Sequence, residues 1–447
     1  MKGKIFEAYL LPAILSMLLL LPHLFFFDNG YVDVEPLYVQ AASEIAEHGF
    51  NANLSKYFTD VANPVFTSLI LSASYKLFWE SPAISRLTIF LLSFLFSLFL
   101  YYYLRNREGV FVAFVAVLLV IVNPFFIVYS QYITSDVPFM VFSSIALLLL
   151  LYGSSFKGEI LSSIMLGISL ATKYVAVILF PVVFIYSLVK SKIFKHFSKT
   201  RLFSLLRSNL WYFALSLLVS APIISIVFNF LSGIRSPEYE SKLVLNAGMF
   251  MPRFFAYLLW LGLFIGPFFL VFIFDLWKRI GKMKFFMLLI GLGVVTLLVS
   301  LFFPITSLHV QEGYFGEMNL SWLESIVPAP YLSVALFFVL LVAEFFIASI
   351  TLLVHNRDEK IIHLFFWILI PILLMSLTRV ANRYMFTVLV PLSLYMAFVM
   401  KKMYSGRTKL FILAVLVLHV LIFLSLGFYS NYYLHQRGLE ASIAIQK

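Results

Sequence analysis

Two carboxylates, Asp33 and Glu35, stand one residue apart in the stretch DVEPLYVQAASEIAEHG, shortly after the first apolar run of the chain. A carboxylate pair in such a place suits a general base that takes a proton from a hydroxyl group. The structural alternative is that both are acids at the N-terminal end of a helix, where the macrodipole stabilises negative charge. The spacing alone leaves both interpretations open.

A third carboxylate, Asp136, begins an apolar run in SQYITSDVPFMVF and has no basic neighbour in sequence. A charged group at the edge of hydrocarbon is costly unless it is paired or hydrated, which makes Asp136 a candidate site residue. Helix capping before Pro138 is the alternative.

Four cations lie at or within apolar runs: Arg86, Lys173, Arg379 and Arg383. Guanidinium forks suit phosphate, and a group of cations in such positions could hold an anion near a membrane surface. Taken singly, each could instead be an anchor whose aliphatic stem lies along apolar surface while its charge reaches water.

Other chemistries have little support in the sequence. The chain has no cysteine, and His309 with Glu312 and Glu317 lacks the spacing of a zinc site. No phosphate-binding glycine loop and no serine nucleophile motif is present. The sequence therefore identifies no certain cofactor, and a divalent metal stays an open alternative without support.

Composition defines the class of protein. Of the 447 residues, 62% are hydrophobic and 12% charged, and the apolar runs have the length of membrane-spanning helices. The sequence predicts an all-α polytopic membrane protein that occupies residues 1–447 as one domain, with no soluble domain. The net charge of +11 then indicates basic loops facing lipid rather than a nucleic-acid partner.

About thirteen spans are expected from these runs. They cover residues 9–27, 84–104, 110–129, 138–153, two within 160–189, 210–230, 254–274, 285–302, 331–354, 361–378, 384–400 and 410–427. This arrangement puts most of the Lys and Arg residues on one side, so the positive-inside rule predicts a cytoplasmic N-terminus. The span pair within 160–189 is expected to form a hairpin with Lys173 at its outer tip.

The first extracytoplasmic loop, residues 28–85, is expected to carry two interfacial helices. One follows from the apolar positions between Val34 and Ile45, which repeat with helical spacing; Pro36 suits its first turn and Gly49 its end. The other covers 64–79, which is about 24 Å long as a helix and so too short to span a bilayer.

These stretches resemble the GT-C glycosyltransferases, in particular the dolichyl-phosphate-mannose-protein mannosyltransferase and aminoarabinose transferase group. In DVEPLYVQAASEIAEHG, Glu35 and Tyr38 match the glutamate and tyrosine of the group's acidic motif. Further likeness comes from Asn63-Pro64-Val65, Arg86-Leu87, SDVPFMVFSSIALLLL, ATKYVAVILFP and NRYMFTVLVP. The likeness is fairly continuous over residues 28–190 and local over 379–391.

Two positions depart from the group's pattern. Val34 stands where the catalytic aspartate is expected, so either Asp33 acts from one residue earlier, Glu35 substitutes, or catalysis is altered or lost. Asn63 and Val65 replace a His or Lys and a second proline, which affects any acceptor or phosphate contact at that point.

The resemblance implies an inverting transfer of a sugar from a polyprenyl phosphate (dolichyl or undecaprenyl) to a glycan, lipid or protein acceptor. It implies Asp33 or Glu35 as base, Arg86, Arg379, Arg383 and Lys173 around the donor phosphate, and Tyr38, Asn63 and Asp136 lining the site. The site would be extracytoplasmic, in a cell membrane or an endoplasmic-reticulum-type membrane. The alternatives are a transporter or flippase of a lipid-linked saccharide and an inactive subunit of a glycosylation complex.

Overall fold

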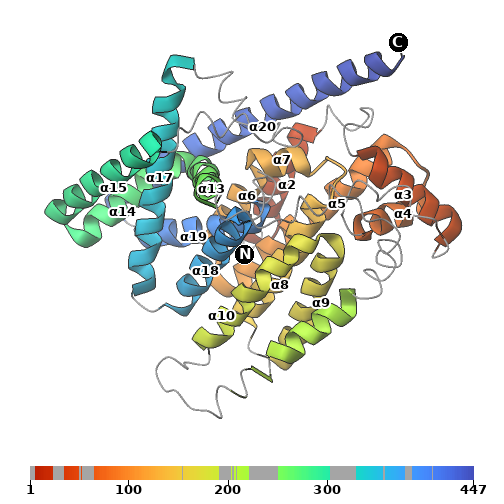
Figure 1. Ribbon diagram of the computed structural model, residues 1–447, viewed down its shortest axis with the longest axis horizontal. Coiled ribbons are helices and arrows are strands. Elements are labelled where there is room, and N and C mark those ends of the chain that lie inside the picture. Colours follow the sequence, from red (N-terminus) through yellow and green to blue (C-terminus); the bar gives the residue numbers. More distant parts are fainter. Residues whose placement is uncertain are drawn as a thin grey trace. The chain divides into compact units, whose positions relative to one another are not determined.

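The computed structural model describes residues 6–23, 35–49, 52, 65–153, 155–190, 203, 206–207, 209–220, 250–302, 329–355, 358–377, 385–404 and 406–446. Throughout these residues the regular elements are helices, which confirms the all-α class (Figure 1). The chain divides into two compact units, residues 1–241 with 426–447 and residues 242–425.

Five helical segments in the described residues are long and apolar enough to cross a membrane. They are Pro82–Glu108, Arg253–Ile280, Glu359–Ser376, Phe386–Met403 and Lys409–Ser430. Shorter apolar helices lie at Leu11–His23, Val110–Ile121, Asp136–Tyr152, Val175–Lys190, Asn209–Ser220 and Phe337–Thr351. The chain is therefore an integral membrane protein, while the count of thirteen spans stays a prediction.

In the first unit, the described residues between Phe6 and Lys190 form a series of helices. Its elements are η1 (Phe6–Leu10), α2 (Leu11–Leu20), η2 (Leu21–His23), α3 (Glu35–His48), α4 (Phe66–Leu77), α5 (Pro82–Glu108), α6 (Val110–Ile121), α7 (Pro124–Tyr129), α8 (Asp136–Tyr152), α9 (Phe156–Thr172), η5 (Tyr174–Leu179) and α10 (Phe180–Lys190). Helix α5 contacts α2, α4, α6 and α8, so it is the central helix of this unit.

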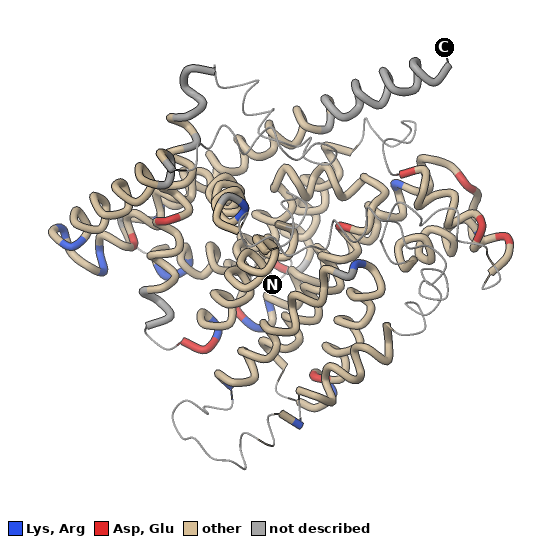
Figure 2. The backbone as a smooth tube through the Cα atoms, in the orientation of Figure 1, with Lys and Arg blue, Asp and Glu red and all other residues tan. Residues whose placement is uncertain are grey.

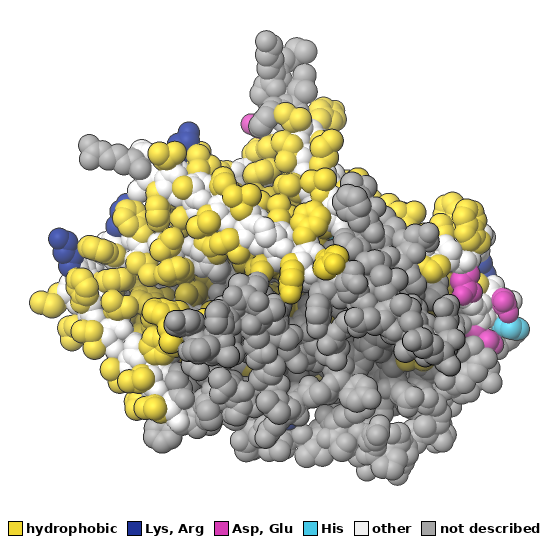
Figure 3. Space-filling view, turned by 90° about the horizontal axis from the view of Figure 1, so that it is seen from above, with side chains coloured by type: hydrophobic (Ala, Val, Ile, Leu, Met, Phe, Trp, Pro, Cys, Tyr) yellow, Lys and Arg dark blue, Asp and Glu magenta, His cyan; other side chains and the backbone are white. Residues whose placement is uncertain are grey.

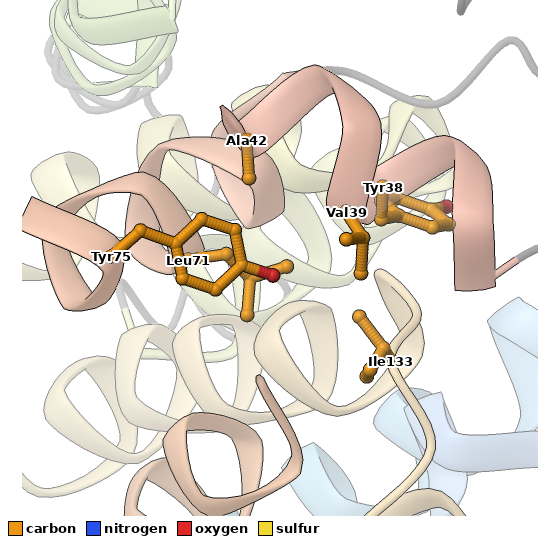
Figure 4. Close-up of a cluster of buried hydrophobic side chains, with 6 residues drawn as sticks. All are labelled: Tyr38, Val39, Ala42, Leu71, Tyr75 and Ile133. Atoms are coloured by element: carbon orange, nitrogen blue, oxygen red, sulfur yellow. The ribbon is translucent and has the colours of Figure 1, made fainter. Parts of the chain in front are cut away.

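Helices α3 and α4 are the two helices expected between the first and second spans. As predicted, α3 begins beside Pro36, and Gly49 follows it with a φ of +60°, a conformation that favours glycine. Figure 4 shows their shared core, in which α3 contributes Tyr38, Val39 and Ala42, α4 contributes Leu71 and Tyr75, and Ile133 joins from the segment before α8. The apolar face of α3 therefore packs against protein.

The segment 160–189 divides where the sequence analysis expected. Helix α9 ends at Thr172, and Lys173 has extended backbone with φ −158° and ψ 125° before η5 begins at Tyr174. A second core of Phe139, Leu170 and Ala176 packs α8 against both sides of this break. The break therefore places Lys173 close to the first turn of α8.

The second unit is also helical. Its elements are α13 (Phe250–Ile265), η7 (Gly266–Phe268), α14 (Phe269–Ile280), α15 (Lys282–Phe302), α17 (Ala329–His355), α18 (Glu359–Ser376), α19 (Phe386–Met403), η11 (Gly406–Thr408) and the start of α20 (Lys409–Gln446). Glu344, a carboxylate within the apolar helix α17, accepts a hydrogen bond from Thr296 of α15 at 2.7 Å. This contact offsets part of the cost of a carboxylate in hydrocarbon.

A glycine lets α13 and α17 cross closely. A Cβ atom added at Gly262 would lie 2.1 Å from the backbone oxygen of Val339, whereas one added at Gly291 of α15 would meet nothing within 4 Å. Small residues at crossings allow close backbone approach in membrane helices. Gly262 and Gly291 therefore form a matched pair of positions for measuring how much this close crossing contributes to stability.

We expect Gly262→Ala to destabilise the protein by about 1–3 kcal/mol, because the added methyl group forces the two backbones apart. Gly291→Ala should be neutral or stabilising by up to about 1 kcal/mol, because alanine favours helix and has open space there. Thermal denaturation of both purified variants in one detergent measures this difference in stability. Equal melting temperatures would contradict the close approach of α13 and α17 at Gly262.

Candidate functional site

Glu35 is the first residue of α3, and its carboxylate is fully buried. Its Oε2 accepts a hydrogen bond from Nη2 of Arg86 at 2.8 Å, and its Oε1 accepts one from the backbone N–H of Ile133 at 2.9 Å. Arg86 lies in the second turn of α5 and is only 5% exposed. The charge of each side chain is thus balanced inside the protein, as a buried ion pair requires.

Tyr38 lies one turn further along α3 and contacts the same part of the chain. Its hydroxyl donates to Oγ of Ser135 at 3.3 Å, and its backbone oxygen accepts from Ser68 of α4 at 3.1 Å. The N-terminal end of α3 is therefore fixed both to α4 and to the residues between α7 and α8. We call these residues, Ser130–Ser135, the α7–α8 segment.

The other end of the α7–α8 segment is held by the first apolar helix. Nε2 of His23 and Oγ of Ser130 are 2.6 Å apart, and the His23 ring also packs on Phe90 of α5 with ring centroids 5.0 Å apart. Both His23 and Ser130 are buried. The segment is thus attached at its start to η2, at its middle to Glu35 and at its end to Tyr38.

Asp136 follows the segment directly and opens α8. Its carboxylate forms an ion pair with the ammonium group of Lys173, and both residues are buried. The backbone N–H of Lys173 still donates to the oxygen of Ser169 at 2.9 Å, so the last turn of α9 is complete before the chain extends. The structure therefore brings together two residues that the sequence analysis considered separately.

Two buried ion pairs thus adjoin the α7–α8 segment: Glu35–Arg86 meets it at Ile133, and Asp136–Lys173 follows its last residue directly. Figure 2 shows that charged residues are few along the described helices, most of which are tan. Low dielectric strengthens each pair and makes the loss of one partner costly. The arrangement can hold two carboxylates and two cations in fixed positions where water is largely excluded.

Four of the predicted site residues, Asp33, Asn63, Arg379 and Arg383, lie outside the described residues. Their roles stay predictions, and so do those of Glu35, Tyr38, Arg86, Asp136 and Lys173, whose positions are now known. His309, Glu312 and Glu317 also lie outside the described part. Within the described ranges, no group of three or more His, Asp or Glu residues could hold a metal ion.

The sequence analysis missed the α7–α8 segment and His23. The signal for the segment was the polar run Ser130, Gln131, Thr134 and Ser135 between two apolar runs, directly before Asp136. The bond from Ile133 had no signal, because a backbone N–H looks the same at every position.

Comparison with known proteins supports the interpretation of the fold. Residues 62–225 match the family model described as dolichyl-phosphate-mannose-protein mannosyltransferase. The chain is similar in structure to apo ArnT from Cupriavidus metallidurans, with a TM-score of 0.54 and 12% identity, over 96% of this chain and 76% of that one. This chain has the GT-C fold.

Other solved structures with this fold come from Archaeoglobus fulgidus. The oligosaccharyltransferase AglB has a TM-score of 0.52 at 11% identity, and the apo oligosaccharyltransferase has 0.50 at 14%. This chain is covered to 95% and 97% in these two matches but spans only 56% of each of those proteins. No curated protein sequence matches the chain. The resemblance to GT-C glycosyltransferases expected from the sequence is confirmed.

A prediction follows for the Glu35–Arg86 pair of this GT-C chain. Arg86→Met is expected to cost about 3–5 kcal/mol of stability, because it leaves a buried carboxylate without its cation. The double variant Glu35→Gln/Arg86→Met should be more stable than Arg86→Met alone, because no unpaired charge remains. Thermal denaturation in detergent measures both.

Arg107→Met is the matched control, because Arg107 is an exposed arginine at the other end of the same helix. It should change stability by no more than about 0.5 kcal/mol. If Arg86→Met were equally harmless, the pair would not be a buried structural interaction.

Proposed function

We propose that this protein transfers a sugar from a polyprenyl-phosphate-linked donor to an acceptor hydroxyl on the extracytoplasmic side of the membrane, with inversion at the anomeric carbon. The observation that carries the proposal is the family match over residues 62–225, which includes Arg86, Asp136 and Lys173. We also propose that the N-terminus is cytoplasmic, from the distribution of basic residues in the sequence.

A lipid-linked donor suits an integral membrane protein in which Arg86 and Asp136 are buried at the ends of apolar helices. AglB, which shares the fold, was solved in complex with an inhibitory peptide and a dolichol-phosphate. A donor of that class would deliver its sugar phosphate at the membrane surface, so the protein would need no nucleotide-binding domain.

Asp33 is the better candidate for the base. Both carboxylate oxygens of Glu35 are engaged, one by Arg86 and one by the backbone of Ile133. These donors stabilise the ionised form and direct the carboxylate into the protein, which suits a residue that positions others. We therefore assign proton transfer to Asp33 and positioning of the N-terminal end of α3 to Glu35.

The proposed reaction is a single displacement. Asp33 takes the proton of the acceptor hydroxyl while its oxygen forms a bond to C1 of the sugar, and the bond from C1 to the phosphate oxygen breaks. The polyprenyl phosphate leaves with the bonding electron pair. Arg379 and Arg383, with Arg86, are proposed to stabilise the charge that develops on this leaving group. Tyr38 and Asn63 are proposed to line the site.

Lys173 and Asp136 are proposed to act together near the donor phosphate. Because Lys173 already forms an ion pair with Asp136, its ammonium group is held in position before any donor binds. A cation fixed in advance needs no reorganisation when negative charge develops.

The decisive experiment is sugar transfer by the purified protein in nanodiscs, with a panel of radiolabelled polyprenyl-phosphate sugars and a crude membrane fraction as acceptor. Asp33→Asn should lower the transfer rate about 10²-fold to 10⁴-fold, the usual contribution of a general base, with an unchanged melting temperature. Glu35→Gln should lower both the rate and the melting temperature, because it disturbs the buried pair with Arg86.

Glu47→Gln is the control for these two variants, because Glu47 lies exposed on α3. Glu47→Gln should change neither the transfer rate nor the melting temperature. Full activity of Asp33→Asn would remove Asp33 as the base, and the absence of transfer from every donor in the wild type would contradict the proposed function.

The second pair gives a separate prediction. Lys173→Met should lower both stability and transfer, because it leaves Asp136 charged and unpaired in a buried place. Adding Asp136→Asn should restore most of the melting temperature while the transfer rate stays low, because the proposed donor contact is still missing. If transfer returned together with stability, the pair would be structural only.

A further inference from the structure

The end of α4 carries three large apolar residues that the first unit leaves uncovered. Leu77, Phe78 and Trp79 are 78%, 61% and 65% exposed, although most large apolar side chains of α3 and α4 are buried in their shared core. Exposed apolar groups at adjacent positions are uncommon in a protein surface that faces water. We call these three residues the α4 tip.

The α4 tip is held beside the beginning of α5. Thr88 donates to Oγ of Ser74 at 2.9 Å, and the hydroxyl groups of Tyr75 and Ser85 are 2.6 Å apart. These bonds join the last turn of α4 to the first two turns of α5. The tip therefore lies close to the end of a helix that is long and apolar enough to cross a membrane.

Helix α5 has an uncovered apolar stripe that starts at this end. Leu87, Leu91 and Leu95 are all exposed and follow one another at intervals of four residues, so they share one side of the helix. Arg86, by contrast, is buried against Glu35. The stripe lies on a helix that is long and apolar enough to cross a membrane, so we expect it to face lipid. Figure 3 shows hydrophobic side chains over much of the described surface of one face of the molecule.

We propose that the α4 tip inserts into the lipid leaflet that surrounds this end of α5, and so anchors the α3–α4 pair to the bilayer surface. The tip continues the lipid-facing stripe, and its composition is that of interfacial anchors. Tryptophan is enriched at the level of the head groups, while the exposed Lys76 can direct its charge towards water or lipid phosphate.

The anchor has a geometric consequence that does not depend on the reaction catalysed. Because α3 packs on α4 through Tyr38 and Leu71, fixing the tip in lipid also fixes the depth of α3 relative to the membrane surface. The partner of the α4 tip is thus the lipid bilayer itself.

The chain contains no cysteine, so single cysteines can be introduced into the otherwise native sequence. Phe78→Cys, carrying a nitroxide spin label in nanodiscs, should collide with oxygen several-fold more than with a water-soluble nickel chelate. The references are Leu91→Cys, on the lipid-facing stripe, and Glu47→Cys, on the exposed polar side of α3. The ratio of the collision rate with oxygen to that with the nickel chelate should be similar at positions 78 and 91 and much lower at position 47.

Either of two results would overturn the proposal. A ratio at position 78 equal to that at 47 would place the tip in water, and protection from both collision partners would show that another protein surface covers it. Tryptophan emission provides a check that leaves position 78 unchanged. Brominated lipids should quench wild-type emission more strongly than that of Trp79→Phe, although the chain has six tryptophans, and equal quenching would again contradict insertion.

Discussion

The buried carboxylate of Glu35 is the constraint on which the first unit depends. A charge in this position is tolerated only if a cation and hydrogen-bond donors meet it. Arg86 supplies the cation from α5 and Ile133 supplies a backbone N–H from the α7–α8 segment. Three parts of the chain must therefore come together at one residue, and that residue begins α3.

The second buried pair extends this constraint along the chain. The α7–α8 segment ends where α8 begins, and the first residue of α8, Asp136, pairs with Lys173 at the end of α9. Because Ile133 and Asp136 are three residues apart, a displacement at one ion pair is transmitted to the other through a short piece of backbone. His23 contacts Ser130 at the start of the same segment. The α7–α8 segment is therefore held at both ends and has little freedom to move independently of its neighbours.

Local features of this arrangement could be predicted from the sequence because their causes are local. Pro36 and Gly49 mark the ends of α3, the short apolar run at 64–79 gives α4, and Lys173 interrupts an apolar run too long for one span. The candidate residues Arg86, Asp136 and Lys173 were found because charges beside apolar runs are costly, and Glu35 was found from its spacing with Asp33.

The pairing of those residues could not be predicted. Glu35 and Arg86 are 51 positions apart and Asp136 and Lys173 are 37 apart, so only the tertiary packing decides which acid meets which base. Treating Arg86 and Lys173 as phosphate ligands alone left out the carboxylates that hold them. The number of spans stays a prediction, because membrane-length runs and shorter apolar helices have the same composition.

Helix α5 connects the charged site with the bilayer. Arg86 and Leu87 are adjacent in sequence, yet one is buried against Glu35 and the other belongs to the exposed stripe, because successive residues of a helix point about 100° apart. A single helix thus carries both the ion pair and the exposed apolar stripe that we propose faces lipid. Any change in the depth of α5 moves both together, so the hydrophobic match between α5 and the membrane sets the depth at which the Glu35–Arg86 pair is held.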